Sequence, residues 1–483
     1  MKIKLSIKIF VAIILVLNGL STPLLLTAQT SDIKITIHLR GVYDSKISLL
    51  ALNQSQLFKP ILVVEGIKNG DTASMTVPKK YLPGEFVLRF DYKEKESSTP
   101  YPSEKHIFIY NQDLELWVIP MYSNNADSTF FQADEKENNA FAWFSEENMM
   151  NKEKLGVLQN FLMNYDDTGS EFYQEGIKEY EKRRLSYNEW LAKRVETDKE
   201  LFVSNLYGFQ HVPQIPWKGT ENDRVLSLIE HYFDGIDFSD SLIIKTSDIN
   251  KWMDNYVNLY GQMVSTISLR DSLFSLAGIS AIEEAKKGHP LVYGWMVDYF
   301  YRGYEANGLD AGIKILEPYM NDPSCLTSKR QEISRRLEGI ETLVPGSGAP
   351  AISMTDPQGG LFNLCDYGTP GDYILILFWS ADCDHCMEMV SALYPWQQQN
   401  DVINKLSVVA ISLDETETEI AAWNQKIADF KSWKHLLAPE GVRSQVAYDY
   451  YILATPIMVL LDAKSKEIVA LPGTLTELKK EVE

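Results

Sequence analysis

Cysteine is scarce in this chain, with four residues among 483. So few cysteines exclude a disulfide-stapled scaffold, and each domain must be held by its own hydrophobic core. Basic residues are also outnumbered, with 46 Lys and Arg against 66 Asp and Glu and a formal net charge of −20. Because an acidic surface repels phosphate backbones, we expect no nucleic-acid partner. A regular repeat of the kind that builds helical solenoids is lacking too.

The apolar run at the N-terminus is short. Lys2, Lys4 and Lys8 make a basic start, residues 9–17 are apolar, and Thr27-Ala28-Gln29 ends the stretch. This layout is typical of a secretory signal peptide, which we place at residues 1–29. The run is short for a membrane span, so we expect membrane association only if this segment is retained. Export places the protein in the periplasm or cell envelope, where cysteine pairs can oxidise.

Three regions follow, with different hydrophobic periods. Residues 31–125 alternate with period two, as in 33–39 and 86–92, which indicates an all-β sandwich or barrel, of which we expect the sandwich. Residues 134–343 show helical spacing, as in Trp252, Tyr256, Leu259, Tyr260 and Met263, and predict an all-α region. We expect such aromatic stripes to be core more often than a binding groove.

The Gly- and Pro-rich segment 345–350 reads as a linker. After it, the apolar runs 373–378, 406–413 and 457–461 predict a central sheet covered on both faces. Helical segments lie between and after these runs. Residues 345–483 are therefore expected to form an α/β layered domain.

The segment Trp379-Ser-Ala-Asp-Cys-Asp-His-Cys386 carries the most chemistry. It follows a predicted buried strand, where the next helix should begin with Asp382 as its N-cap. Two residues three apart at a helix start lie about 5–6 Å apart on one face, which suits a disulfide. Free N–H groups and the helix dipole stabilise a thiolate there. We expect Cys383 to attack and the more shielded Cys386 to resolve the mixed disulfide.

The neighbours of these cysteines act in opposite directions. His385 would favour the Cys383 thiolate, whereas Asp382 and Asp384 disfavour it, so the direction of exchange stays open. Two thiols and one His fall short of the four ligands of structural zinc, and we expect no metal or cofactor. An inert structural disulfide is disfavoured because so short a loop constrains little.

Residues 345–483 resemble thioredoxin-fold proteins of the exported TlpA/ResA type. The resemblance is carried by Gly348-Ala-Pro350, Phe378-Trp379, Cys383-Asp-His-Cys386, the segment 408–414, and Thr455-Pro456 before a buried strand. It implies a thioredoxin-like fold and disulfide exchange with exported proteins, supported by an unidentified thiol electron donor. It also implies that Thr455 and Pro456 form a cis-proline element that binds substrate, with Trp379 packed under the active-site loop. The two preceding regions resemble β-sandwich and helical accessory modules.

Three departures from that family bear on proton handling. Leu377 stands where cytoplasmic thioredoxins carry a buried Asp. Met389 and Ser391 stand where many exported relatives carry Glu and Pro, while Glu388 is one residue early. Asp382 replaces a common Trp. The proton acceptor for Cys386 is therefore not identified by the resemblance.

Two other functions compete with thiol–disulfide exchange. A peroxiredoxin-like peroxidase needs a Ser or Thr three residues before its reactive cysteine, and Ser380 meets this need before Cys383. It also needs a Pro seven residues before that cysteine, where this chain has Ile376. A binding or assembly protein would use the thioredoxin-like domain only for docking. Cys325 and Cys365 could form a clamp, or Cys365 could join the exchange, but we favour two ordinary buried thiols.

Overall fold

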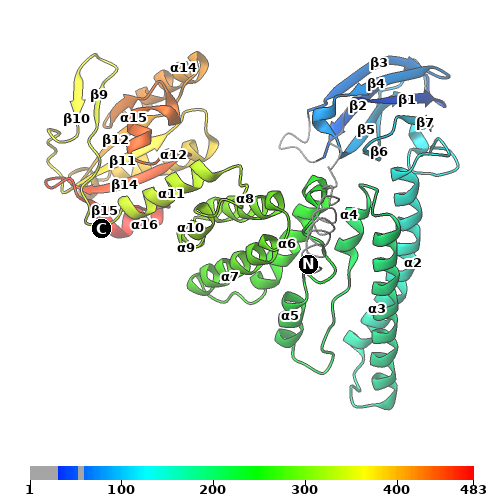
Figure 1. Ribbon diagram of the computed structural model, residues 1–483. Helices are drawn as coiled ribbons and strands as arrows, with labels where there is room; N and C mark the ends of the chain where they lie inside the picture. The colour runs from blue at the N-terminus through cyan, green and yellow to red at the C-terminus, as the bar shows by residue number, and fades with distance from the viewer. Residues whose placement is uncertain (1–30, 53–58) are drawn as a thin grey trace, which may run out of the picture. The chain divides into compact units, whose positions relative to one another are not determined.

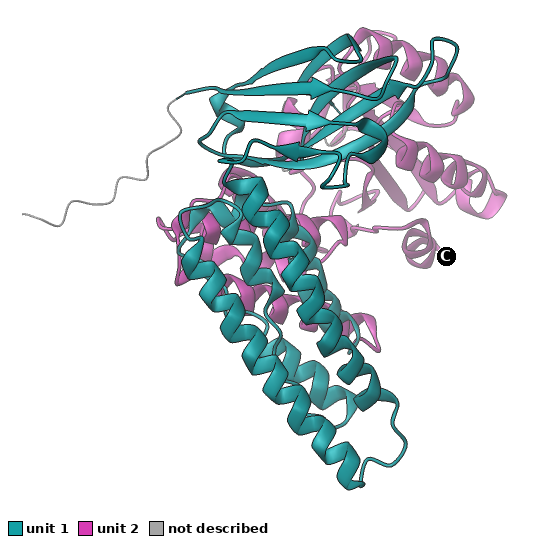
Figure 2. Cartoon of the chain, turned by 90° about the vertical axis from the view of Figure 1, so that its right-hand side faces the viewer, with its two compact units in different colours: residues 1–263 teal, residues 264–483 magenta. Residues whose placement is uncertain are grey.

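The computed structural model describes residues 31–52 and 59–483. The predicted signal peptide, residues 1–29, lies outside the described residues. Among the helices that are described, none is both long and apolar enough to cross a membrane. The chain forms two compact units, residues 1–263 and residues 264–483, which Figure 2 colours separately.

The first unit begins with two four-stranded sheets, of order β4-β1-β7-β8 and β3-β2-β5-β6 (Figure 1). Inward side chains of both sheets form one shared hydrophobic core, which confirms the predicted β-sandwich. The strands are β1 Ile33–Leu39, β2 Asp44–Ala51, β3 Leu62–Lys68, β4 Thr72–Val77, β5 Gly84–Lys93, β6 Tyr101–Ile109, β7 Leu114–Val118 and β8 Phe130–Phe131.

Strand β1 shows why this sequence makes a sandwich. Its four apolar residues, Ile33, Ile35, Ile37 and Leu39, are buried, and the residues between them are exposed or half-buried. Successive side chains of a strand point to opposite faces, so the alternation leaves one apolar face for the core. The strand pairs antiparallel with β4 and parallel with β7.

Helices complete the first unit. Their bounds are α2 Glu137–Asn164, α3 Glu171–Thr197, α4 Ser204–Tyr207, α5 Glu221–Glu230 and α6 Asp248–Gly261. In α6 the buried residues are Ile249, Met253, Tyr256 and Tyr260, so two residues of the predicted stripe are core, while Leu259 and Met263 are half-buried. Trp252, which the stripe also included, is only half-buried because the buried face is turned one residue from the expected one.

The second unit opens with further helices. These are α7 Ile267–Lys286, α8 Pro290–Ala306, α9 Asp310–Lys314, α10 Glu317–Met320 and α11 Arg330–Thr342. The boundary between the two compact units thus falls inside the region 134–343 that we expected to be one helical domain. The predicted domain limits 31–125, 134–343 and 345–483 stay predictions.

The expected linker 345–350 is bonded to the sheet that follows it. The Gly346 N–H donates to the Ile468 carbonyl at 2.7 Å, and the Ala349 N–H donates to the Lys466 carbonyl at 2.9 Å. Helix α11 also contacts this part of the chain, because the Arg335 guanidinium donates to the Ala447 carbonyl at 2.9 Å. These bonds tie the end of the helical region to the α/β part.

The α/β part is built on a five-stranded sheet of order β13-β12-β11-β14-β15. Strands β11, β12 and β13 are parallel, and β14 and β15 run antiparallel to their neighbours. Separate hydrophobic cores lie on its two faces, as the continuous apolar runs predicted. The elements, yellow to red in Figure 1, are β9 Ser353–Thr355, β10 Leu361–Asn363, β11 Tyr373–Trp379, α12 Asp384–Gln397, α13 Asn400–Ile403, β12 Leu406–Ser412, α14 Glu417–Lys426, β13 Lys434–Leu437, α15 Gln445–Asp449, β14 Ile457–Asp462, β15 Ile468–Ala470 and α16 Leu475–Val482.

Candidate functional site

The two cysteines lie at the start of helix α12, directly after strand β11. Cys383 is the N-cap, and its Sγ accepts the backbone N–H of Cys386 at 3.3 Å. The prediction that Asp382 is the N-cap is wrong, because the helix begins at Asp384 and the Cys383 side chain is the one that accepts a first-turn N–H. Cys383 is half-buried, Cys386 is buried, and both are free thiols.

Local sequence explains this placement. Residues Ile374 to Trp379 of β11 are all buried, which fixes the strand in the sheet up to the residue before the loop. Helix α12 then buries Cys386, Val390 and Leu393, at spacings of four and seven residues. One apolar face therefore draws the helix onto the sheet and takes Cys386 inward with it. Cys383 stays at the exposed end.

The inner sulfur, Cys386, is kept protonated by its surroundings. Burial, with a smaller contribution from the adjacent Cys383 side chain, raises the pKa of Cys386 to about 12. Hydrogen bonds from the Thr455 side chain and the Ser380 backbone lower that pKa in part. Cys386 is therefore a thiol at neutral pH. Cys383 lies nearer the surface, and its sulfur accepts an N–H at the N-terminal end of the helix.

Strand pairing in the sheet places Thr455 and Pro456 close to the cysteines. Strand β14 runs antiparallel to β11, with Ile457 opposite Phe378, so the residues before β14 lie beside the end of β11. The Thr455–Pro456 peptide bond is cis, which agrees with what the resemblance implies. The Cys383 thiol donates to the Thr455 carbonyl at 3.8 Å. Thr455 thus contacts both sulfurs, through its carbonyl and its side chain. A role in substrate binding stays a prediction.

Asp414 is part of the site, although no role was predicted for it. Strand β12 lies parallel to β11, with Ser412 opposite Trp379, so Asp414 stands beside the loop that leads to Cys383. Its carboxylate is fully buried. It accepts the Ser380 hydroxyl at 2.5 Å and the Ala381 N–H at 3.1 Å. An acidic residue just after a buried strand that neighbours the cysteine strand was the available signal.

The other two predicted site residues, His385 and Trp379, differ in exposure. His385 is exposed in the first turn of α12. Trp379 is fully buried, in the same core as Cys386, and its ring meets that of Phe430 edge-on at 6.3 Å. It lies beneath the site, as the resemblance implies. Its side chain has no exposed surface, and a role for Trp379 in substrate binding stays a prediction.

No carboxylate acts on the pKa of Cys386 among the described groups that shift it. Leu377 is buried within β11, and Glu388 is exposed. Met389 is half-buried and Ser391 is exposed on α12. The departures from the family pattern therefore leave an apolar environment around the inner thiol.

The two remaining cysteines are free thiols in different environments. Cys325 is buried, and burial raises its pKa. Cys365 is exposed, so the expectation that both are buried is wrong for Cys365. It follows strand β10 in a turn where its N–H donates to the Asn363 side chain at 3.0 Å. Nowhere in residues 31–52 and 59–483 do three or more His, Cys, Asp or Glu side chains group as metal ligands.

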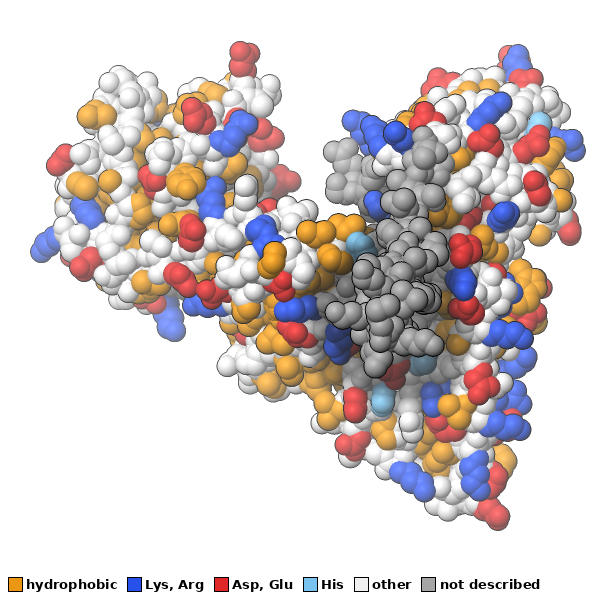
Figure 3. Space-filling view, in the orientation of Figure 1, with side chains coloured by type: hydrophobic (Ala, Val, Ile, Leu, Met, Phe, Trp, Pro, Cys, Tyr) orange, Lys and Arg blue, Asp and Glu red, His pale blue; other side chains and the backbone are white. Residues whose placement is uncertain are grey.

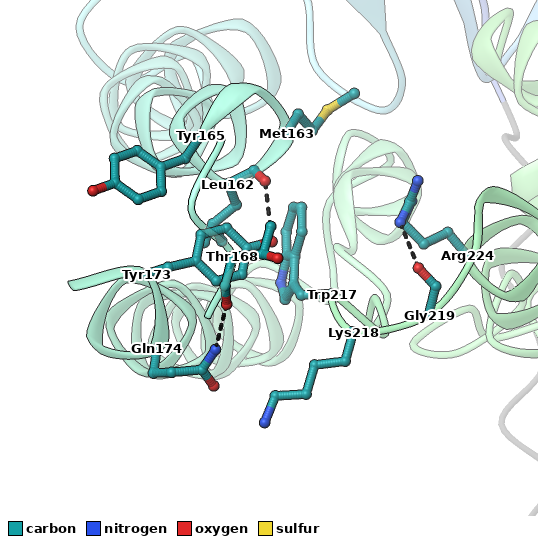
Figure 4. Close-up of a pocket in the computed structure, with 10 residues that line it drawn as sticks. All are labelled: Leu162, Met163, Tyr165, Thr168, Tyr173, Gln174, Trp217, Lys218, Gly219 and Arg224. Carbon is teal, nitrogen blue, oxygen red and sulfur yellow. Dashed lines mark hydrogen bonds between the residues drawn. The ribbon is translucent and has the colours of Figure 1, made fainter. Parts of the chain in front are cut away.

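A cavity of about 410 Å³ lies in the first unit, between the end of α2, the start of α3 and helix α5 (Figure 4). None of the predicted site residues lines it. The polar side chains of Tyr173, Gln174 and Arg224 already donate to backbone carbonyls of its wall at 2.9 to 3.2 Å. The Trp217 N–H is buried and has no hydrogen-bond partner among the described residues. On the face shown in Figure 3, acidic and basic side chains are interspersed.

Comparison with known families agrees with the fold of the C-terminal part. Residues 371–468 match a family model described as thioredoxin-like. The matched range contains the cysteines, Asp414, Thr455 and Pro456. Residues 371–468 are thus a thioredoxin-like domain, and the predicted fold class is confirmed for this part. Among curated proteins, no relative was found.

Three solved structures illustrate the similarity. A thioredoxin-like protein from Bacteroides caccae is 21% identical, with 56% of this chain and 96% of that chain covered and a TM-score of 0.40. The thioredoxin domain of a thiol-disulfide oxidoreductase from Bacteroides vulgatus is 27% identical, with 29% and 99% covered and a TM-score of 0.25. A thiol:disulfide interchange protein from Bacteroides sp. is 28% identical, with 29% and 90% covered and a TM-score of 0.24.

Proposed function

We propose that this protein is a thiol–disulfide oxidoreductase that exchanges disulfides with exported proteins through Cys383 and Cys386. One observation carries the proposal: the half-buried Cys383 sulfur accepts the Cys386 N–H at 3.3 Å at the first turn of a helix. Such a sulfur is held as a nucleophile at an accessible position, while its neighbour is buried one turn deeper. The thioredoxin-like fold supports this reading.

The chemistry proceeds in two displacements. The Cys383 thiolate attacks one sulfur of a partner disulfide, so a mixed disulfide forms and the partner's other sulfur leaves as a thiolate. Cys386 then loses its proton and attacks the Cys383 sulfur, which releases the partner's second thiolate. The partner gains two electrons and, after protonation, two protons. The Cys383–Cys386 pair is oxidised and needs an exogenous thiol to be reduced again. The reverse sequence oxidises a partner dithiol.

The high pKa of Cys386 sets the order of these steps. A thiol with a pKa of about 12 is protonated at neutral pH, so Cys386 does not compete for the partner disulfide. It becomes a nucleophile only once it is held against a mixed disulfide on Cys383. The Thr455 side chain, which lowers that pKa, is placed to assist the second step.

The partners and the compartment belong to the proposal as well. The N-terminal pattern of a basic start, a short apolar run and a small-residue end supports export to the periplasm or cell envelope. Disulfides persist in that compartment, so exported proteins are available as partners. The electron donor is a thiol of unidentified source.

Trapping tests this function directly. The full chain carrying Cys386→Ser, expressed in a cell envelope, should accumulate mixed disulfides with exported proteins, because the resolving thiol is absent. The variant Cys383→Ser is the matched control and should accumulate none. Insulin disulfide reduction by the wild type should exceed that of both variants. Equal activity of wild type and Cys383→Ser would refute catalysis and favour a binding or docking role.

A further inference from the structure

The loop that joins β11 to α12 is bonded to a single buried carboxylate. Asp414 Oδ1 accepts the Ser380 hydroxyl at 2.5 Å and the Ala381 N–H at 3.2 Å. Its Oδ2 accepts the same N–H at 3.1 Å and the Ser412 hydroxyl at 2.6 Å. Ser380 in turn accepts the Asp382 N–H at 3.2 Å. Every residue between the strand and Cys383 is thereby linked to Asp414.

In the described part of the chain, Asp414 is held by hydrogen bonds and not by an ion pair. A carboxylate has about four lone-pair sites, and three donors bind here, with the Ala381 N–H shared between both oxygens. Asp414 is not among the groups that shift the pKa of Cys386. Among the described residues, no Lys, Arg or His forms an ion pair with Asp414, which is fully buried. A buried carboxylate without a cation depends on its hydrogen bonds, so breaking them is costly and the loop is held firmly.

We propose that Asp414 is a positioning residue, which acts through Ser380 and Ala381 to hold the Cys383 sulfur on the N–H of Cys386. This inference rests on the proposed function for its biological meaning. Asp414 acts on Cys383 through the backbone of the loop. Loop residues 380–382 cannot shift without breaking a bond to Asp414 or Ser380, and Cys383 is the next residue along the chain. With the loop fixed, the N-cap sulfur stays at 3.3 Å from its donor.

Asp414→Asn is the informative replacement, because it keeps the size of the side chain and removes the charge. The new side chain would have to place its amide NH₂ where either oxygen now receives a donor, so the Ala381 N–H or a serine hydroxyl would lose its acceptor. We expect the loop to relax and Cys383 to leave the N–H of Cys386. The thiolate would then be less favoured at neutral pH.

The experiment compares the alkylation rate of Cys383 at pH 7 with its rate at pH 10, in the full chain. Iodoacetamide is the probe, and mass spectrometry of the Cys383 peptide separates it from the other thiols. This ratio reports the thiolate population rather than the amount of folded protein. We expect Asp414→Asn to lower the ratio about tenfold and Ser380→Ala to lower it about threefold. The double variant should match Asp414→Asn alone, because both changes break one link.

The matched control is Ser407→Ala on the same strand, whose hydroxyl is bonded to Thr369 instead of Asp414. Its ratio should equal that of the wild type. An unchanged ratio in folded Asp414→Asn would overturn the inference. If that variant does not fold, Ser380→Ala decides, and an unchanged ratio there overturns it too. A lowered ratio in a protein that lacks exchange activity would retain the positioning role and reject the proposed function.

Discussion

Replacing Cys383 with serine isolates the inner thiol and makes its acidity measurable. Burial is the largest cause that raises the pKa of Cys386 from 9.0 to about 12, and the Cys383 side chain adds to it. The variant removes the second cause and keeps the first. A difference of three pH units corresponds to about a thousandfold smaller thiolate population, or about 4 kcal/mol. We therefore expect Cys386 to be alkylated about tenfold to a thousandfold more slowly at pH 7 than in the unfolded chain.

The assay follows iodoacetamide labelling by mass spectrometry between pH 7 and pH 11. Only the thiolate reacts, so the rate should rise about tenfold for each pH unit as long as the pH stays below the pKa. Labelling in urea gives the reference rate of the exposed thiol, and Cys365, which is exposed, checks the reagent within the folded chain.

This pH dependence separates acidity from access. If burial acted only by blocking the reagent, the rate would be limited by opening of the structure and would not follow the thiolate population. A rate that levels off below pH 9, or that equals the unfolded rate at pH 7, would refute the reasoning. It would also remove the argument that Cys383 must attack first.

Two further predictions concern single polar groups. Burial raises the pKa of Glu137 to about 7 from 4.5, so the folded state favours its protonated form. The stability it confers is present below pH 4.5 and is lost as the pH rises to 7, by at most about 3 kcal/mol. Urea unfolding at pH 5 and pH 8, followed by circular dichroism, should show a smaller difference in Glu137→Gln than in the wild type. An equal difference would contradict this. Thr455→Val removes the side-chain hydrogen bond that lowers the pKa of Cys386. Release of a trapped partner from Cys383 should slow about fivefold, while the attack of Cys383 stays unchanged. Stopped-flow measurement of both steps checks this, and equal slowing of the two would count against it.

Much of the fold could be read from the local pattern. The alternation in 33–39 predicted β1 with its bounds, and the apolar run 373–378 predicted β11 to within one residue. The N-cap residue was misplaced by one, from Asp382 to Cys383. Both residue types can accept a backbone N–H, and in the structure it is Cys383 that accepts the Cys386 N–H. Helix ends are decided by such local competition.

The limits of the compact units could not be read in the same way. The Gly- and Pro-rich segment 345–350 has the composition of a linker, yet its backbone bonds to residues 466 and 468. The first unit ends inside the helical region, at residue 263. Composition reports which segments are intrinsically flexible, but a pairing partner far along the chain can still order them.

The sequence by itself determined the chemistry that is contiguous: two thiols three residues apart, at the point where a buried strand gives way to a helix. Spacing and helix geometry are local, so no other part of the chain was needed to infer them. Only the tertiary structure decided which residues surround the sulfurs. Sheet register sets Ile457 opposite Phe378 and Ser412 opposite Trp379, and so brings Thr455 and Asp414 to the site. The pKa of Cys386 was decided there too, since burial results from the packing of α12 on the sheet.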